Sequence, residues 1–217
     1  MSFPVALLDL DGTMIDSRPG ILACMRRAIA DLGHALEPDE DLNWMIGPPM
    51  EQTMGTLLAR WGDPRAAEAV TIYRRHYAES GLYDCAVYPG IAAALAEFAA
   101  ERWTLFVATA KRTRYARPIL EHFGLAGYFS AIYGSEDGPR LDTKPVMLAH
   151  ILSERRFSPA RAVMIGDRHY DIEGARANAM RAIGVGWGYG GAEEFLLADA
   201  VADSPADLPA LARGLLD

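Results

Sequence analysis

Short apolar segments that end at small or acidic residues recur along the chain and constrain its fold more than any other feature. They lie at residues 5–8, 104–108, 131–133, 162–165 and 182–185. Apolar runs of this length are typical of parallel strands buried on both faces. Helical patterns lie between them, at 90–102, 114–123 and 145–156. This alternation predicts an α/β fold with a doubly wound parallel sheet, in which ligands bind at the carboxyl ends of the strands.

Residues 18–86 break the alternation, because their pattern is helical throughout. Helices are expected at 21–32, 50–61 and 65–80, separated by turn signals such as Gly47-Pro48-Pro49. We therefore expect a core domain made of 1–16 and 88–217, with a small inserted α-helical cap domain at 17–87. The alternative is that these helices pack on the sheet within a single domain.

Two acids directly follow the first predicted strand, in the sequence Asp9-Leu10-Asp11-Gly12-Thr13. Buried carboxylates are unstable unless cations or hydrogen-bond donors lie beside them. A capped turn, with Asp11 or Thr13 capping the next helix, would account for one acid. It would leave the second acid at the mouth of the sheet unexplained, whereas a metal ion would account for both.

A second acidic pair, Asp167 and Asp171, follows the strand predicted at 162–165. If a helix begins near Arg168, the two acids lie on one face of it. Alternatively, Asp167 caps this helix and Asp171 interacts with its dipole. Considered together, the acids after two strands favour a Mg²⁺ site, because Mg²⁺ takes few protein carboxylates and keeps several waters.

Two further residues have a possible role at the same edge of the sheet. Thr109 ends the strand predicted at 104–108, where its hydroxyl and the backbone amides near Ala110 could hold a phosphate oxygen. On its own this pattern favours a simple helix cap. Lys144 begins a predicted helix, and most lysines are solvated surface charges. Four acids at one site would, however, need a compensating cation to admit an anionic substrate.

These four elements, in this order, resemble the four motifs of the haloacid dehalogenase-like hydrolase superfamily. The resemblance extends over essentially the whole chain, and it implies a Rossmann-like core with a small helical cap. Within the superfamily, three sequences look most like the phosphoglycolate phosphatase and bacterial 5′-nucleotidase branch: Gly47-Pro48-Pro49, Tyr88-Pro89-Gly90 and residues 166–172.

The resemblance implies roles for the motif residues. Asp9 would be the nucleophile that forms an aspartyl-phosphate, and Asp11 the general acid and base. Mg²⁺ would be held by Asp9, the Asp11 carbonyl and Asp167, with Asp171 acting through water. Lys144 and Thr109 would stabilise the phosphoryl oxygens. The substrate-binding set would be Thr109, Ala110, Lys144 and Gly12.

The expected activity is hydrolysis of a small phosphomonoester, similar to that of phosphoglycolate phosphatase. The alternative substrate is a nucleoside monophosphate, as for a 5′-nucleotidase. A phosphomutase, a dehalogenase and a non-catalytic regulatory module are weaker alternatives. Asp11 favours phosphoryl over haloalkyl chemistry, because a dehalogenase has no use for an acid there. The loop after the first strand lacks a G-x-G-x-x-G pattern, which argues against dinucleotide binding.

The composition of the chain limits the partners and the cellular compartment that we expect. The net charge of −8 disfavours nucleic acid polymers, so the expected partner is a small phosphorylated metabolite. The only cysteines, Cys24 and Cys85, favour a reducing, cytoplasmic compartment. We expect no signal peptide and no membrane span. The sequence leaves open whether the chain is a monomer or a dimer.

Substrate choice is expected to lie in the cap. Candidates are the loop at 45–50 and the cations Arg18, Arg60, Arg74 and Arg75, although a solvated helix face is the favoured interpretation of each arginine. Trp187-Gly188-Tyr189-Gly190 follows the last predicted strand. It could line the rim of the site or be a glycine-rich connector with a packed aromatic residue.

Overall fold

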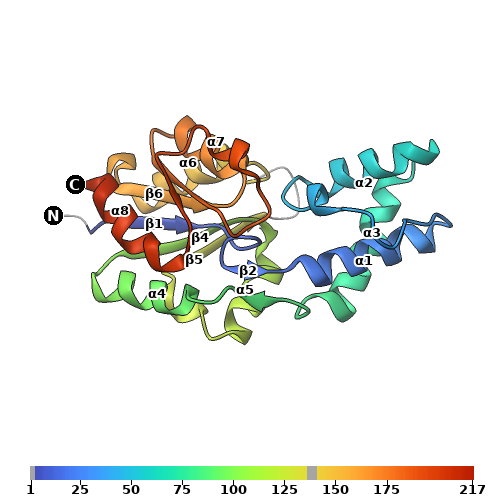
Figure 1. The fold of residues 1–217 in the computed structure, drawn as a ribbon, viewed down its shortest axis with the longest axis horizontal. Helices are drawn as coiled ribbons and strands as arrows, with labels where there is room; N and C mark the ends of the chain where they lie inside the picture. Colours follow the sequence, from blue (N-terminus) through green and yellow to red (C-terminus); the bar gives the residue numbers. More distant parts are fainter. Residues whose placement is uncertain (1–2, 136–140) are drawn as a thin grey trace. The chain divides into compact units, whose positions relative to one another are not determined.

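The computed structural model describes residues 3–135 and 141–217, and the chain divides into two compact units (Figure 1). The first unit contains Met1–Asp16 and Val87–Asp217, and the second contains Ser17–Ala86. The chain leaves the first unit after the short strand β2 (Ile15–Asp16) and returns through β3 (Ala86–Val87), with which β2 pairs.

A six-stranded sheet in the order β5-β4-β1-β6-β7-β8 forms the centre of the first unit. Every pair of neighbouring strands in it is parallel. The strands are β1 (Val5–Leu8), β4 (Thr104–Arg112), β5 (Ala131–Ser135), β6 (Ala162–Gly166), β7 (Arg181–Val185) and β8 (Ala200–Ala202). The chain visits the strands on either side of β1 in turn, which confirms the predicted doubly wound α/β fold.

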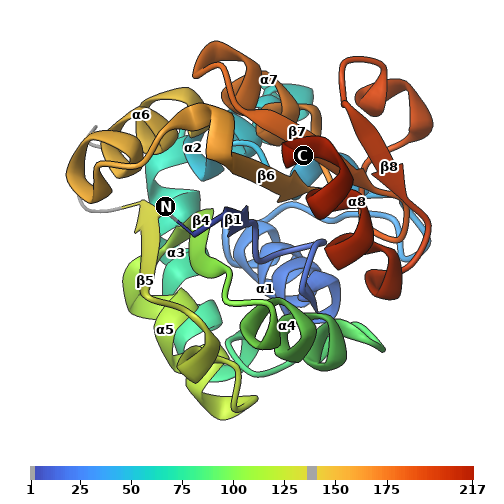
Figure 2. The same cartoon turned by 90° about the vertical axis from the view of Figure 1, so that its left-hand side faces the viewer.

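Helices cover both faces of this sheet (Figure 2). One face carries α6 (Lys144–Arg155) and α7 (His169–Ala177), and the other carries α4 (Ile91–Ala100), α5 (Thr113–His122) and α8 (Leu208–Leu216). Successive side chains of a strand point to opposite faces. Leu7, Phe106 and Met164 therefore pack toward α6 and α7, against buried side chains such as Met147 and Ile172.

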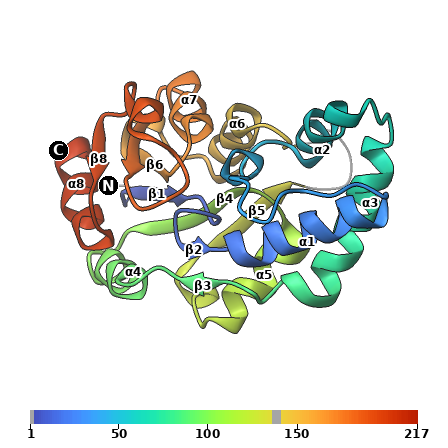
Figure 3. The same ribbon diagram turned by 45° about the vertical axis from the view of Figure 1, so that its right-hand side comes forward.

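The second unit is helical and contains α1 (Arg18–Asp31), α2 (Met50–Leu58) and α3 (Ala66–His76), which continues into a π-helical turn at Tyr77–Gly81 (Figure 3). Both α1 and α2 pack on α3. Glycine ends α1, since Gly33 takes the left-handed conformation at φ 88°. The helices predicted at 21–32, 50–61 and 65–80 are confirmed.

Short 3₁₀ turns complete the secondary structure, at Asn43–Met45, Ala59–Trp61, Ala126–Tyr128, Pro159–Arg161, Ala192–Phe195 and Pro205–Asp207. Among the helices of the described residues, we find none that is both long and apolar enough to cross a membrane.

The structure differs from the sequence prediction in several places. β4 does not end near Thr109 but continues to Arg112, with irregular pairing to β5 between these residues. The expectation that the strand ends at Thr109 and that Thr109 caps a helix was therefore wrong. The helix predicted at 114–123 is confirmed as α5, which begins at Thr113. The sequence pattern also did not predict the short strands β2 and β3, the strand β8 or the helix α8. β8 is only Ala-Val-Ala between Asp199 and Asp203, which is a weak strand signal, and its central Val201 is 46% exposed.

Candidate active site

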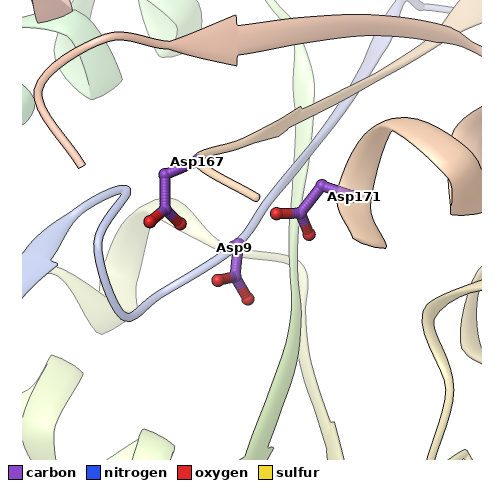
Figure 4. A group of neighbouring side chains, drawn as sticks. All are labelled: Asp9, Asp167 and Asp171. Atoms are coloured by element: carbon purple, nitrogen blue, oxygen red, sulfur yellow. The ribbon is translucent and has the colours of Figure 1, made fainter. Parts of the chain in front are cut away.

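Three of the predicted site residues lie together at the carboxyl ends of two adjacent strands. Asp9 follows β1 and Asp167 follows β6, and these strands pair with Leu8 opposite Ile165. Asp171 lies in the first turn of α7. Each side chain offers one oxygen atom within 4.8 Å of the others, and Figure 4 shows the three carboxyl groups gathered around one point.

The three carboxylates are buried close together, so they require compensating positive charge. Asp9 is 9% exposed, and Asp167 and Asp171 are 0% and 2% exposed. Burial, reinforced by the charges of Asp171 and Asp11, raises the pKa of Asp9 to about 6 despite the opposing effect of Lys144. Burial and the neighbouring Asp9 and Asp171 also raise the pKa of Asp167 well above its ordinary value. Carboxyl groups with raised pKa values favour a positive charge nearby, and their oxygen atoms are suitable ligands for a hard divalent ion.

Lys144 provides a positive charge beside two acids of the cluster, Asp9 and Asp171. Its Nζ atom lies 3.0 Å from Asp9 Oδ1 and 2.7 Å from Asp171 Oδ1, and it donates a 2.6 Å hydrogen bond to the carbonyl of Ala108. Burial lowers the pKa of Lys144, but the charges of Asp171 and Asp9 outweigh burial and raise it overall. Lys144 is therefore a permanent positive charge beside Asp9.

Thr109 and Ala110 lie at the same edge of the sheet, within the extended part of β4. Thr109 is 1% exposed, and its Oγ1 accepts a 3.2 Å hydrogen bond from the backbone N–H of Lys111. The hydroxyl thus supports the irregular strand end instead of capping a helix. Ala110 is exposed, and its carbonyl accepts a 2.8 Å hydrogen bond from Ser135.

A family model described as haloacid dehalogenase-like hydrolase matches residues 6–185 of the sequence, which include the acids of both strands. The chain is a haloacid dehalogenase-like hydrolase. The family resemblance predicted from the four motifs is therefore confirmed, and the protein is an enzyme of this family.

Individual relatives carry different names. The hydrolase is 40% identical to a 5′-nucleotidase of Pseudomonas aeruginosa, over 99% of this chain and 96% of that protein. It is 32% identical to a phosphoglycolate phosphatase of Cupriavidus necator, over 94% and 91%. It is also 40% identical to tyrosine-protein kinase PtkA of Mycobacterium tuberculosis, over 87% of this chain but only 64% of that protein. Among solved structures, a haloacid dehalogenase-like hydrolase of Streptococcus pneumoniae has a TM-score of 0.88 at 29% identity, covering 96% of this chain and 98% of that one.

The hydrolase has a second buried lysine at this site, Lys111, which the sequence pattern did not predict. Its Nζ atom lies 2.8 Å from the carboxylate of Asp11, and its side chain is 6% exposed. The carboxylate of Asp11 therefore faces a cation of its own, whereas its backbone carbonyl as a metal ligand stays a prediction. One sequence signal points to Lys111: the 21 basic residues include only two lysines, Lys111 and Lys144, and the rest are arginines.

Gly12 and Thr13 bring the loop after β1 against Asp167. Gly12 has φ 82°, and a Cβ atom on it would lie 2.1 Å from Asp167 Oδ2. Thr13 Oγ1 donates a 3.2 Å hydrogen bond to Asp167 Oδ1. The glycine of this motif is therefore explained by close approach to Asp167. A contact of Gly12 with substrate stays a prediction.

Glu194 holds the start of α7 in the hydrolase. Its carboxylate accepts hydrogen bonds from Arg168 Nε at 2.9 Å and from the backbone N–H of His169 at 2.9 Å. These donors outweigh partial burial and lower the pKa of Glu194 to about 2. Because Asp167 and Asp171 flank this turn, Glu194 helps to fix the two acids relative to each other.

Arginines proposed as specificity residues are engaged inside the helical unit. Arg60 pairs with Glu40, Arg74 with Glu51 at 3.1 Å, and Arg75 with Asp31 at 2.9 Å. These exposed pairs are typical of solvated helix faces. The role of Arg18 and of the loop at 45–50 in substrate choice stays a prediction.

Proposed function

We propose that this hydrolase is a Mg²⁺-dependent phosphatase that cleaves a small phosphomonoester with Asp9 as its nucleophile. One observation carries the proposal: Asp9 shares a buried cluster with Asp167 and Asp171, and Lys144 lies 3.0 Å from its carboxylate. Such a carboxylate is held in place and lies next to groups that can neutralise a phosphate.

Each side chain would have one task in the reaction. A carboxylate oxygen of Asp9 attacks phosphorus, the bond from phosphorus to the leaving oxygen breaks, and an aspartyl-phosphate forms. Asp11 gives a proton to the leaving oxygen and takes one from the water that cleaves the intermediate. Lys144 and the Thr109 hydroxyl stabilise the charge on the phosphoryl oxygens.

The acidic residues fit a divalent metal. Mg²⁺ would be held by Asp9, the Asp11 carbonyl and Asp167, with Asp171 acting through water. When bound, it supplies positive charge that reduces repulsion between a carboxylate and a phosphate dianion. With four ionised carboxylates and two protonated lysines, the site has two negative charges in excess, which one divalent ion balances.

Two classes of substrate are proposed. The name of the Pseudomonas relative, at 40% identity over almost the entire chain, supports a nucleoside 5′-monophosphate. The name of the Cupriavidus relative supports phosphoglycolate. The motif sequences resemble a branch that contains both activities. We further propose that residues 17–87 act as a cap domain on a core of 1–16 and 88–217. We propose a cytoplasmic location, in keeping with Cys24 and Cys85, which form no disulfide.

A substrate panel tests the proposal. The purified protein is incubated with nucleoside 5′-monophosphates, 2-phosphoglycolate and sugar phosphates, with Mg²⁺ or with EDTA, and the release of inorganic phosphate is measured. We expect Mg²⁺-dependent release with a preference for one class. Full activity in metal-free buffer, or no release from any ester, would overturn the proposal. Transfer of phosphate from ATP to a tyrosine peptide, without hydrolysis of the esters, would favour the kinase named among the relatives.

A further inference from the structure

The segment 187–190, which follows β7, lies directly against the acids of the site. Trp187 Nε1 donates a 2.9 Å hydrogen bond to the carbonyl of Thr13, and the backbone N–H of Tyr189 donates a 2.9 Å hydrogen bond to Asp167 Oδ2. The Tyr189 hydroxyl also lies 3.1 Å from Asp16 Oδ1. One short segment therefore contacts Asp167 and both ends of the stretch from Thr13 to Asp16.

Close packing explains the two glycines of this segment. A Cβ atom on Gly188 would lie 2.2 Å from the Cβ of Asp167 and 2.5 Å from the carbonyl oxygen of Gly12. A Cβ atom on Gly190 would lie 2.1 Å from the carbonyl oxygen of Asp167. These three neighbours are backbone atoms or a side-chain atom next to the backbone, so they cannot move aside easily. At positions 188 and 190 the backbone therefore lies too close to Asp167 to leave room for a side chain.

Asp167 is consequently held at both carboxylate oxygens. Thr13 Oγ1 donates to Oδ1 at 3.2 Å, and the N–H of Tyr189 donates to Oδ2 at 2.9 Å. The side chain is also completely buried. A carboxylate fixed in this way loses no rotational freedom when it binds an ion, and its remaining lone pairs keep one direction.

We propose that segment 187–190 is a positioning element for the metal, which fixes the Asp167 carboxylate in its ligating orientation. The inference rests on the proposed function, because it requires that Asp167 bind a divalent cation. Tyr189 contributes its backbone N–H, and Gly188 leaves room for this contact. Trp187 holds Thr13, whose hydroxyl donates to the other carboxylate oxygen. A segment that only connects β7 to the next turn would affect the stability of the fold and leave metal affinity unchanged.

A matched pair of glycine variants separates these roles. Gly188→Ala places a methyl group against Asp167, whereas Gly186→Ala in the same loop places one at an ordinary distance, 3.5 Å from the Ala202 carbonyl. Mg²⁺ and Mn²⁺ affinities are measured by titration calorimetry on the metal-free proteins, which needs no turnover. We expect Gly188→Ala to bind about 10-fold more weakly or worse. Gly186→Ala should remain within about twofold of the wild type.

A second pair covers the case in which Gly188→Ala does not fold, as judged by thermal unfolding. Trp187→Phe removes the indole N–H that bonds Thr13, and Trp103→Phe removes one that bonds Glu101, away from the site. Only Trp187→Phe should weaken metal binding, by a few-fold. If the wild type binds metal and every folded variant at 187 or 188 binds it equally well, the inference is wrong while the proposed function stands. If the wild type binds no divalent metal, both are overturned.

Discussion

The ammonium group of Lys111 lies 2.8 Å from the carboxylate of Asp11, in a part of the site that is distinct from the pair formed by Lys144 and Asp9. Each lysine thus partners one of the two acids that follow β1. The proposed nucleophile and the proposed general acid have separate counter-charges, so the contribution of each lysine can be measured separately.

Lys111→Gln should impair the step that Asp11 serves. Without the ammonium group, the Asp11 carboxylate loses its ion pair with Lys111, and we expect kcat/KM for an alkyl phosphate to fall about 10-fold or more. The loss for p-nitrophenyl phosphate should be smaller, because nitrophenolate leaves without a proton. Steady-state kinetics with both esters measure this difference.

A double-mutant cycle provides the control for Lys111. If Lys111 acts through Asp11, adding Lys111→Gln to Asp11→Asn should cause little further loss. Equal losses for the two esters, or simple additivity of the two substitutions, would show that Lys111 acts in another way.

Asp9→Asn should abolish turnover and preserve the fold. A carboxamide does not attack phosphorus, and we expect kcat to fall by at least about four orders of magnitude. Acid quenching of the wild type with labelled substrate should trap a phosphoprotein that the variant does not form. Circular dichroism checks the fold. A folded variant with appreciable phosphatase activity would exclude Asp9 as the nucleophile.

Metal-free protein should become more stable as the pH falls from about 8 to about 5.5. The pKa of Asp9 is raised from 3.8 to about 6 in the folded state, so the folded chain takes up a proton that the unfolded chain does not bind. The stabilisation that this proton provides is lost as the pH rises through about 6. Asp167 shifts in the same direction. Mg²⁺ competes with these protons and should therefore raise Tm more at about pH 8 than at about pH 5.5.

Thermal unfolding with EDTA or Mg²⁺ at both pH values tests this dependence. In Asp9→Asn the dependence on pH should be weaker, since the titrating carboxyl group is gone. An unfolding temperature that rises with pH in EDTA would contradict the prediction.

Lys144→Met should destabilise the fold far more than Lys111→Gln. Lys144 compensates two buried carboxylates, Asp9 and Asp171, and removal of one partner from a buried pair typically costs about 3 kcal/mol. Asp11 is 17% exposed, so water can partly replace Lys111. Urea unfolding of both variants in EDTA gives the comparison. If both variants lose the same unfolding free energy, the ion pairs of Lys144 stabilise the fold no more than that of Lys111.

Much of the site follows from local sequence. Because parallel strands end at one edge of the sheet, the acids after the strands at 5–8 and 162–165 were expected to meet, and Asp9 and Asp167 do. The five strands that were predicted share one property, an uninterrupted apolar run. In β8 this signal is weak, because the run is a single β-branched residue, Val201, between two alanines.

Other parts depend on contacts between residues far apart in the chain. Lys111 and Arg112 are charged and lie beyond the strand predicted at 104–108, although they continue β4 through irregular pairing with β5. The burial of Lys111 follows from its contact with Asp11, 100 residues away. For the segment 187–190, the pattern was compatible with both a rim and a packed connector. The hydrogen bond from the backbone N–H of Tyr189 to Asp167 shows that the segment packs against the acids.

The scarcity of lysine has a practical consequence for chemical work on this protein. Apart from the amino terminus, Lys111 and Lys144 carry the only primary amines of the chain. Amine-reactive dyes, crosslinkers and sensor surfaces would therefore react only with the amino terminus or with these two lysines beside the acids. Both lysines are buried and ion-paired, so they should be acylated slowly. A bound phosphate ester should suppress this reaction, and the rate of acylation would then measure how much of the site is occupied.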